Sequence, residues 1–164
     1  MKILPLTRRD FVKSTSVAAS ALAFPQVVRS QEGGSANARL NVACVGVGGR
    51  GAAAVAAMKD ENIVALCDVD EARAARTLQA HERVPYFQDY RKLLDQLGNR
   101  IDAVTVSTPD HMHFPIAMAA MALGKHVFAE KPTAHTIEAA HRMANVAREK
   151  KLARVTTPHG RAPL

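Results

Sequence analysis

Short apolar runs alternate with longer amphipathic stretches between residue 39 and residue 156. The runs have the length of buried strands, and the stretches repeat their apolar positions at helical spacing. This regular alternation is typical of an α/β fold, a doubly wound parallel sheet with helices on both faces. The pattern predicts strands over 40–45, 63–67, 84–87, 101–107, 126–129 and 152–156, and helices over 52–58, 71–80, 90–97, 113–123 and 136–150.

A glycine-rich turn separates the first predicted strand from the first predicted helix. Residues 46–51 (GVGGRG) match the spacing G-x-G-x-x-G, and this motif is informative only between a strand and a helix. Gly46 permits a tight turn, Gly48 lets the backbone approach a pyrophosphate, and Gly51 allows close packing of the helix on the sheet. The N-terminus of the helix offers N–H groups and a positive dipole end to phosphates. The turn therefore predicts a dinucleotide site.

Asp68 ends the second predicted strand, 17 residues after Gly51, close to the spacing of about 20 expected in such sites. A carboxylate there can accept hydrogen bonds from the ribose hydroxyls of adenosine. It would also repel a 2′-phosphate, which favours NAD over NADP, although the nearby Arg73 would soften that preference. A second interpretation makes Asp68 the N-cap of the helix over 71–80, for which Asp70 is better placed.

Two further motifs follow the fourth and fifth predicted strands, at the carboxyl ends where such sheets bind ligands. They are residues 108–113 (TPDHMH) and residues 130–132 (EKP). Together with the glycine turn and Asp68, they resemble the Gfo/Idh/MocA family of NAD(P)-dependent oxidoreductases, which includes glucose–fructose oxidoreductase and inositol dehydrogenase. The resemblance covers about residues 39–156 and implies a Rossmann fold.

The resemblance also implies roles for the matching residues. Lys131 would be catalytic: it would contact a substrate hydroxyl and assist proton transfer, and partial burial would bring its pKa toward the working range. Glu130 would fix the ribose beside the nicotinamide, and Pro132 would follow a cis peptide that aims Lys131. The cofactor-binding set predicted in this way is Gly46, Gly48, Gly49, Arg50, Gly51, Asp68, Thr108, Pro109, His113, Glu130 and Pro132.

Simpler interpretations of these motifs stay open. Glu130 and Lys131 can form a solvated pair before a helix, and His111 and His113 can be helix caps. The two histidines are poor metal ligands because no third ligand accompanies them, so no metal is expected.

The function implied is hydride transfer between NAD, or alternatively NADP, and a sugar, polyol or related carbohydrate. Family members continue after the sixth strand into a second α/β domain that carries most of the substrate pocket and the oligomer interface. We therefore expect this chain to lack that substrate domain, and we expect homo-oligomers only of the longer form. The alternatives are a non-catalytic NAD-binding module and an inactive frameshifted fragment. Residues 157–164 do not continue the family pattern, and a frameshift or truncation is our hypothesis for this tail.

The N-terminal residues have the layout of an export signal, with a charged segment followed by a short apolar one. Residues 7–13 (TRRDFVK) resemble the twin-arginine (Tat) signal Ser/Thr-Arg-Arg-x-Phe-Leu-Lys, with Val12 in place of Leu. Residues 1–38 are therefore predicted to be a twin-arginine signal peptide and spacer that engages the Tat export machinery, and the protein to be periplasmic or otherwise exported. Cleavage after Ala38, cleavage after Ser30 and an uncleaved signal remain alternatives.

Composition adds three exclusions. The 164 residues fit one domain, and no apolar run reaches the roughly 18 residues of a membrane anchor. The net charge of +7 includes +3 from residues 1–38, and the remaining basic residues are scattered among acids, so no nucleic-acid partner is expected. Two cysteines are too few for a disulfide framework. Cys44 and Cys67 fall in neighbouring central strands and are predicted to be buried free thiols.

Overall fold

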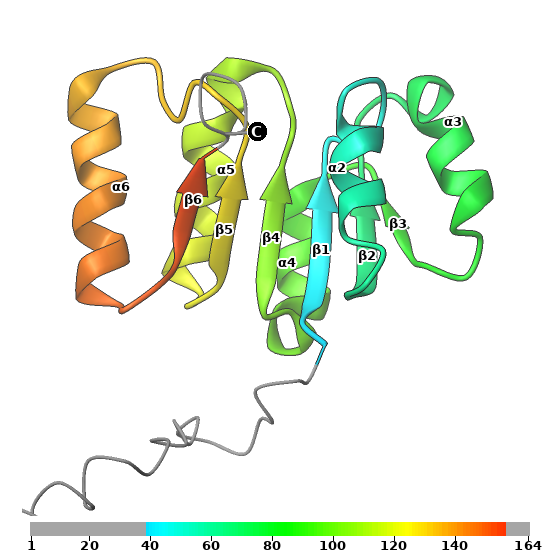
Figure 1. Ribbon diagram of the computed structural model, residues 1–164, viewed down its shortest axis with the longest axis horizontal. Coiled ribbons are helices and arrows are strands. Elements are labelled where there is room, and N and C mark those ends of the chain that lie inside the picture. Colours follow the sequence, from blue (N-terminus) through cyan, green and yellow to red (C-terminus); the bar gives the residue numbers. More distant parts are fainter. Residues whose placement is uncertain (1–38, 157–164) are drawn as a thin grey trace, which may run out of the picture. The chain divides into compact units, whose positions relative to one another are not determined.

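Six strands form one parallel sheet in the computed structural model, which describes residues 39–156 (Figure 1). The strand order is β3-β2-β1-β4-β5-β6, and each neighbouring pair is parallel. The order reverses between β1 and β4, so a crevice opens where their following loops diverge. The predicted doubly wound α/β fold is confirmed. The strands are β1 (Asn41–Val45), β2 (Asn62–Cys67), β3 (Tyr86–Phe87), β4 (Ala103–Val106), β5 (His126–Ala129) and β6 (Arg154–Thr156).

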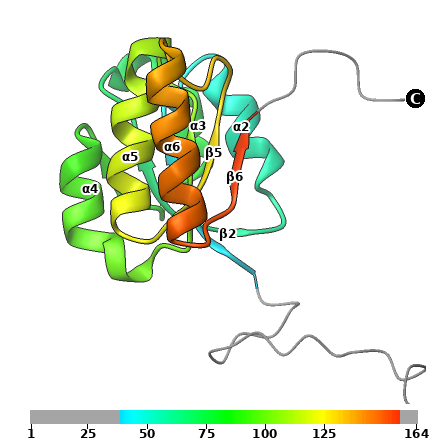
Figure 2. The ribbon, with the colours of Figure 1, turned by 90° about the vertical axis from the view of Figure 1, so that its left-hand side faces the viewer.

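Helices connect the strands and cover both faces of the sheet. Figure 2 shows α4, α5 and α6 on one face and α2 on the opposite face, and the packing places α3 with α2. The helices are α2 (Gly51–Ala57), α3 (Glu71–Ala80), α4 (Tyr90–Leu97), α5 (His113–Ala122) and α6 (Ile137–Glu149), with short 3₁₀ helices η1 (Gly98–Arg100) and η2 (Asp110–Met112).

The two faces of the sheet support separate cores. Alternate strand residues point to opposite faces, so Val104 packs under α5 with Ile116 and Met121, whereas Leu66 packs with Val55 beneath α2. The core under α4, α5 and α6 is the larger of the two. Both cores bury residues of the central strands, and the strands in turn place the loops at their ends.

Cys44 and Cys67 illustrate this alternation. Cys44 belongs to the core beneath α2 and α3, and Cys67 belongs to the core beneath α4, α5 and α6. The prediction that both are buried free thiols is confirmed. Their positions on opposite faces of the sheet keep the two sulfur atoms from pairing.

The predicted elements differ from the observed ones by at most two residues at their ends, and the third strand is an example in which the structure explains the difference. It was expected over 84–87 and pairs only over Tyr86–Phe87. Val84 donates its N–H to the carbonyl of His81 at 2.9 Å, which closes a turn, and Pro85 has no N–H to donate. Asp70, not Asp68, caps α3: its Oδ1 accepts from the backbone nitrogen of Arg73 at 3.0 Å.

The predicted export signal, residues 1–38, and the tail, residues 157–164, lie outside the described residues, so both interpretations stay predictions from sequence. Within residues 39–156, no helix has the length and apolar character needed to cross a membrane.

Candidate functional site

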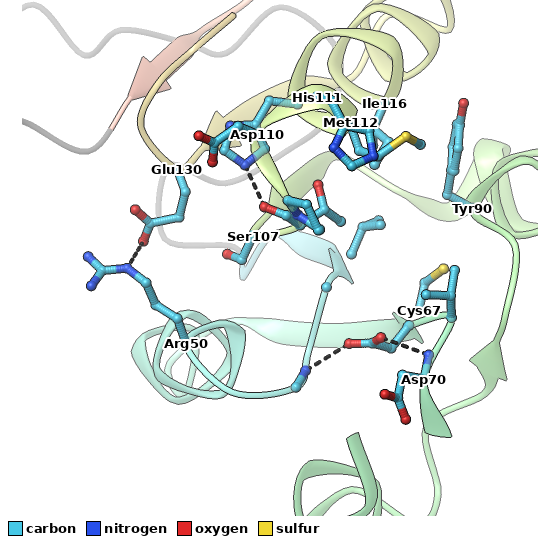
Figure 3. A pocket seen from close by; sticks show the side chains of 18 of the residues that line it. Arg50, Cys67, Asp70, Tyr90, Ser107, Asp110, His111, Met112, Ile116 and Glu130 are labelled. Atoms are coloured by element: carbon cyan, nitrogen blue, oxygen red, sulfur yellow. Dashed lines mark hydrogen bonds and ion pairs between the residues drawn. The ribbon is translucent and has the colours of Figure 1, made fainter. Parts of the chain in front are cut away.

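A cleft of about 810 Å³ lies at the carboxyl ends of the central strands. Figure 3 shows side chains from the loops after β1, β2, β4 and β5 converging on it. Gly49, Gly51 and Pro132 belong to these loops but do not line the cleft. The other predicted site residues do line it: Gly46, Gly48, Arg50, Asp68, Thr108, Pro109, His113, Glu130 and Lys131.

The glycine-rich turn depends on Gly46 and Gly51 for its shape. Gly46 has a φ of +80°, and a Cβ there would lie 2.7 Å from the backbone carbonyl of Ser107. A Cβ on Gly51 would overlap the carbonyl oxygen of Gly46. The tight turn predicted at Gly46 and the close packing predicted at Gly51 are therefore confirmed. At these two positions the backbone of the turn packs so closely against itself and the end of β4 that no Cβ fits.

Asp68 organises this turn from the end of β2. Its Oδ2 accepts hydrogen bonds from the backbone nitrogens of Val47 at 2.9 Å and Gly48 at 2.8 Å. Its Oδ1 accepts from the nitrogen of Asp70 at 3.0 Å, and its carbonyl oxygen accepts from the hydroxyl of Tyr86 at 2.7 Å. Sequence reasoning placed Asp68 in the site but missed its bonds to the turn. No sequence signal distinguishes a carboxylate that faces a ligand from one that also holds a loop.

An ion pair joins the glycine-rich turn to the end of β5. The Nε of Arg50 lies 3.6 Å from the Oε1 of Glu130 (Figure 3). The Arg50 side chain is 72% exposed and the Glu130 side chain 15% exposed. Water screens the guanidinium, so the pair is a weak contact in energy. It still brings two predicted cofactor-binding residues together from distant parts of the chain.

Two hydroxyl groups at the end of β4 are buried in the cleft wall. Ser107 Oγ and Thr108 Oγ1 find no hydrogen-bond partner among the described residues. Buried polar groups in folded proteins almost always have a hydrogen-bond partner. Two adjacent buried hydroxyls without one therefore indicate a place where a polar ligand can bind. Thr108 was predicted for the site, but Ser107 was missed. The available signal was its position at the carboxyl end of the predicted strand over 101–107, next to the motif that begins at Thr108.

Lys131 and its neighbours form the wall on the β5 side. The peptide between Lys131 and Pro132 is cis, as predicted. Lys131 lines the cleft but is exposed, so the expected partial burial is wrong for the described residues.

His113 lies behind this wall and is buried, with 1% of its surface exposed. Its Nδ1 lies 2.7 Å from the carbonyl oxygen of Pro132, and its Nε2 lies 2.8 Å from that of Thr108. The ring therefore bridges the loops after β4 and β5. His113 occupies the C-cap position of η2, as the helix-cap interpretation allowed, but its ring caps neither η2 nor α5.

Cys67 lines the cleft, but its thiol is unreactive as a nucleophile. Burial, and then the nearby charges of Asp68 and Asp89, raise the pKa of its thiol to about 12. Only the thiolate is a good nucleophile, so this sulfur does not act as one near neutral pH. Within residues 39–156, no group of three or more His, Cys, Asp or Glu side chains has the arrangement of a metal site.

The described residues fit a dinucleotide. One cleft lies at the point where the strand order reverses. Around it are a tight turn with no room for a Cβ at Gly46 and Gly51, an acidic residue after β2 and two unpaired hydroxyls after β4. Fold and site together define a dinucleotide-binding Rossmann domain.

The particular family follows from comparison with known proteins. Residues 40–158 match the model of the oxidoreductase family with an NAD-binding Rossmann fold (GFO_IDH_MocA). The chain belongs to this family, as the resemblance of its motifs predicted.

Individual relatives share the domain at moderate identity. A glycosyl hydrolase family 109 protein from Shewanella sp. (strain ANA-3) is 31% identical over 80% of this chain and 34% of its own length. Inositol 2-dehydrogenase 1 from Saccharopolyspora erythraea is 39% identical over 45% of this chain and 22% of its own length. The crystal structure of an NAD binding oxidoreductase from Klebsiella pneumoniae superimposes with a TM-score of 0.62 and 33% identity, covering 73% of this chain and 34% of that protein. The chain thus spans about a third of the length of the glycosyl hydrolase family 109 relatives that it matches.

Proposed function

We propose that this chain is the NAD-binding part of an oxidoreductase that transfers hydride between the nicotinamide and a sugar, polyol or related carbohydrate. The observation that carries the proposal is that one cleft has Asp68 on its β2 side and Lys131 on its β5 side. These are the ends at which the adenosine and the reacting carbon of a dinucleotide–substrate pair would lie in this fold.

Each region of the cleft has a distinct task in this proposal. NAD, when bound, accepts or supplies the hydride. The Asp68 carboxylate accepts hydrogen bonds from the adenosine ribose, while it keeps its bonds to the turn. The hydroxyls of Ser107 and Thr108 gain a polar partner, and Glu130 binds the ribose beside the nicotinamide.

Lys131 would act on the substrate. Its side chain lines the cleft at the end of β5, where its ammonium can donate a hydrogen bond to a substrate oxygen and stabilise negative charge developing on it. Because Lys131 is exposed in the described residues, exclusion of water from this position requires a further segment or the substrate itself.

The carbohydrate class is supported by the names of relatives, which include an inositol 2-dehydrogenase and a levoglucosan dehydrogenase. A second candidate is hydrolysis of a glycoside, favoured by the glycosyl hydrolase names of the relatives that cover 80% or more of this chain. The two candidate reactions, dehydrogenation and glycoside hydrolysis, differ in their use of the cofactor. A dehydrogenase releases one NADH for each product, whereas a hydrolase releases sugar with no net NADH.

The cofactor claim is tested by calorimetric titration of the full chain with NAD and NADP. We expect saturable NAD binding and weaker NADP binding. Asp68→Asn removes the negative charge but keeps an oxygen for the turn. It should therefore reduce the ratio by which the chain binds NAD more tightly than NADP. A folded chain, shown to be folded by circular dichroism, that binds neither nucleotide would refute the proposal. If the variant binds NAD and NADP more weakly by the same factor, Asp68 acts on nucleotide binding only through the turn.

We also propose export by the twin-arginine route to the periplasm. The support is residues 7–13, which match the twin-arginine pattern at all positions except Val12. A reporter fused to residues 1–38 should reach the periplasm in cells with the twin-arginine translocase and remain inside cells that lack it. Replacing Arg8 and Arg9 by lysine should block transport. Transport that continues in the translocase-deficient cells would exclude this route.

A further inference from the structure

Two threonine hydroxyls join the loop after β5 to the end of β6. Thr133 Oγ1 lies 2.8 Å from Thr156 Oγ1, and the contact is part-buried. This is the usual distance for a hydrogen bond between two hydroxyl groups. A hydroxyl can both donate and accept, so one threonine gives its proton to the other in either orientation of the pair. Both side chains are β-branched and stiff at χ1, so their contact also fixes the separation of the two backbones.

The segment that ends at Thr133 is fixed at its other end as well. The amide of Glu130, the first residue after β5, donates to the carbonyl oxygen of Val106 in β4 at 2.9 Å. Thr156 is the register partner of Ala129, the last residue of β5. Segment 130–133 is therefore attached to β4 where it begins and to β6 where it ends, and these strands lie on either side of β5.

Lys131 lies between these two attachments. Its side chain lines the cleft and is exposed, so the place of its ammonium depends on the backbone that carries it. Thr133 and Thr156 do not line the cleft, so their hydroxyl pair acts on the loop from outside the ligand site. A contact of this kind can set where the loop stands without touching a ligand.

We propose that the hydroxyl of Thr156, acting through Thr133, fixes the loop that carries Lys131. Thr156 is a positioning residue in this proposal, since it reaches the cleft only through its partner. Its effect on nucleotide binding rests on the proposed function, in which Glu130 binds the ribose beside the nicotinamide. The pairing of the two hydroxyls does not, because it is a property of the chain without any nucleotide.

A double-mutant cycle followed by urea denaturation tests the pairing in the full chain. Thr133→Val and Thr156→Val each replace a hydroxyl by a methyl group of similar size. Each should lower the equilibrium constant for folding about fivefold, the effect of one hydrogen bond, and the double variant should lower it little further. Losses that simply multiply in the double variant would show that the two hydroxyls are not paired and would overturn the proposal.

Nucleotide binding tests the positioning, because ADP contains the adenosine half of NAD but lacks the nicotinamide and its ribose. Calorimetry of Thr156→Val should show an NAD affinity lower by about two- to fivefold, since up to one hydrogen bond no longer holds the loop. Its ADP affinity should be unchanged. Thr156→Ser keeps the hydroxyl and should bind NAD as the unmodified chain does. If the valine variant changes the two affinities by the same factor, or changes neither, the positioning role is wrong.

Thr136→Val is the matched control, because the same substitution is made three residues after Thr133. The Thr136 hydroxyl caps α6 by accepting from the backbone nitrogen of Ala139 at 3.1 Å, so this variant also loses one hydrogen bond. It should lower the stability by a similar factor and leave the affinities for NAD and ADP unchanged. A lower NAD affinity in this control as well would mean that lost stability alone explains the effect of Thr156→Val.

Two further results are decisive. If Thr156→Val does not fold, Thr133→Val breaks the same pair from the loop side, and its NAD and ADP affinities decide the positioning role. If the unmodified chain is folded yet binds neither nucleotide, the proposed function falls and the positioning role falls with it. The double-mutant cycle still decides the pairing in that case, so the two failures can be told apart.

Discussion

The Oδ2 atom of Asp68 lies 2.8 Å from the backbone nitrogen of Gly48, so a carboxylate at the end of β2 fixes the glycine-rich turn at the end of β1. Val47 donates to the same oxygen at 2.9 Å. The residue predicted to recognise the ribose therefore also supports the loop beside it. We expect variants at this position to change both stability and nucleotide binding, so they must be chosen to separate the two effects.

Asp68→Ala should lower the free energy of unfolding by about 2 kcal/mol, because three N–H groups, two of them part-buried, lose a charged acceptor. Asp68→Asn retains one acceptor oxygen for the turn and should lose less than half as much. Urea denaturation of the full chain followed by circular dichroism measures both values. Equal losses in the two variants would mean that the negative charge, and not the hydrogen-bond geometry, holds the turn.

Gly51→Ala should destabilise the fold by about 3 kcal/mol or more, or prevent folding, because the added Cβ overlaps the Gly46 carbonyl oxygen. Gly98→Ala is the matched control. Its Cβ would meet only Leu123 Cδ1 at 3.7 Å, and its backbone is already helical, so the change should stay within about 1 kcal/mol. Thermal unfolding of both variants makes the comparison. Similar stabilities would show that the turn relaxes to accept a methyl group.

The ion pair between Arg50 and Glu130 should contribute little to stability. Arg50 is 72% exposed, and pairs of this kind contribute about 0.5 kcal/mol or less. A double-mutant cycle with Arg50→Gln and Glu130→Gln should give a coupling free energy of that size, which falls further at high salt. A coupling several times larger would indicate that the pair is shielded from water and holds the cleft in its observed shape.

Alkaline pH should destabilise the chain through Cys67. The folded state raises the pKa of this thiol from 9.0 to about 12, so the folded chain keeps a proton that the unfolded chain loses. The associated stability is complete below about pH 9 and is lost progressively as pH rises toward 12. Burial raises the pKa of Tyr86 as well, which acts in the same direction. Denaturation at several pH values should show a shallower decline in Cys67→Ala, and an unchanged slope would contradict the assignment to Cys67.

Local sequence determined much of this fold. The apolar runs around Val42, Val104 and Val127 identified central strands because a buried parallel strand needs apolar residues on both faces. The glycine spacing, the acidic end of β2 and the motifs after β4 and β5 all lie at one edge of the sheet, as parallel strands require. The predicted length of β3 failed because Val84 satisfies its N–H within a turn, a choice that its apolar side chain does not reveal.

Some features of the site were decided only by the tertiary structure. The contact from His113 to Pro132 and the bonds from Asp68 to the turn join groups about 20 residues apart in the chain. The Ser107 hydroxyl is buried without a partner, which also depends on what packs around it. Sequence fixes which side chains can donate or accept, because that is a property of each residue. Which groups meet depends on how six strands and their loops pack, since contacts of a few ångströms result from the whole fold.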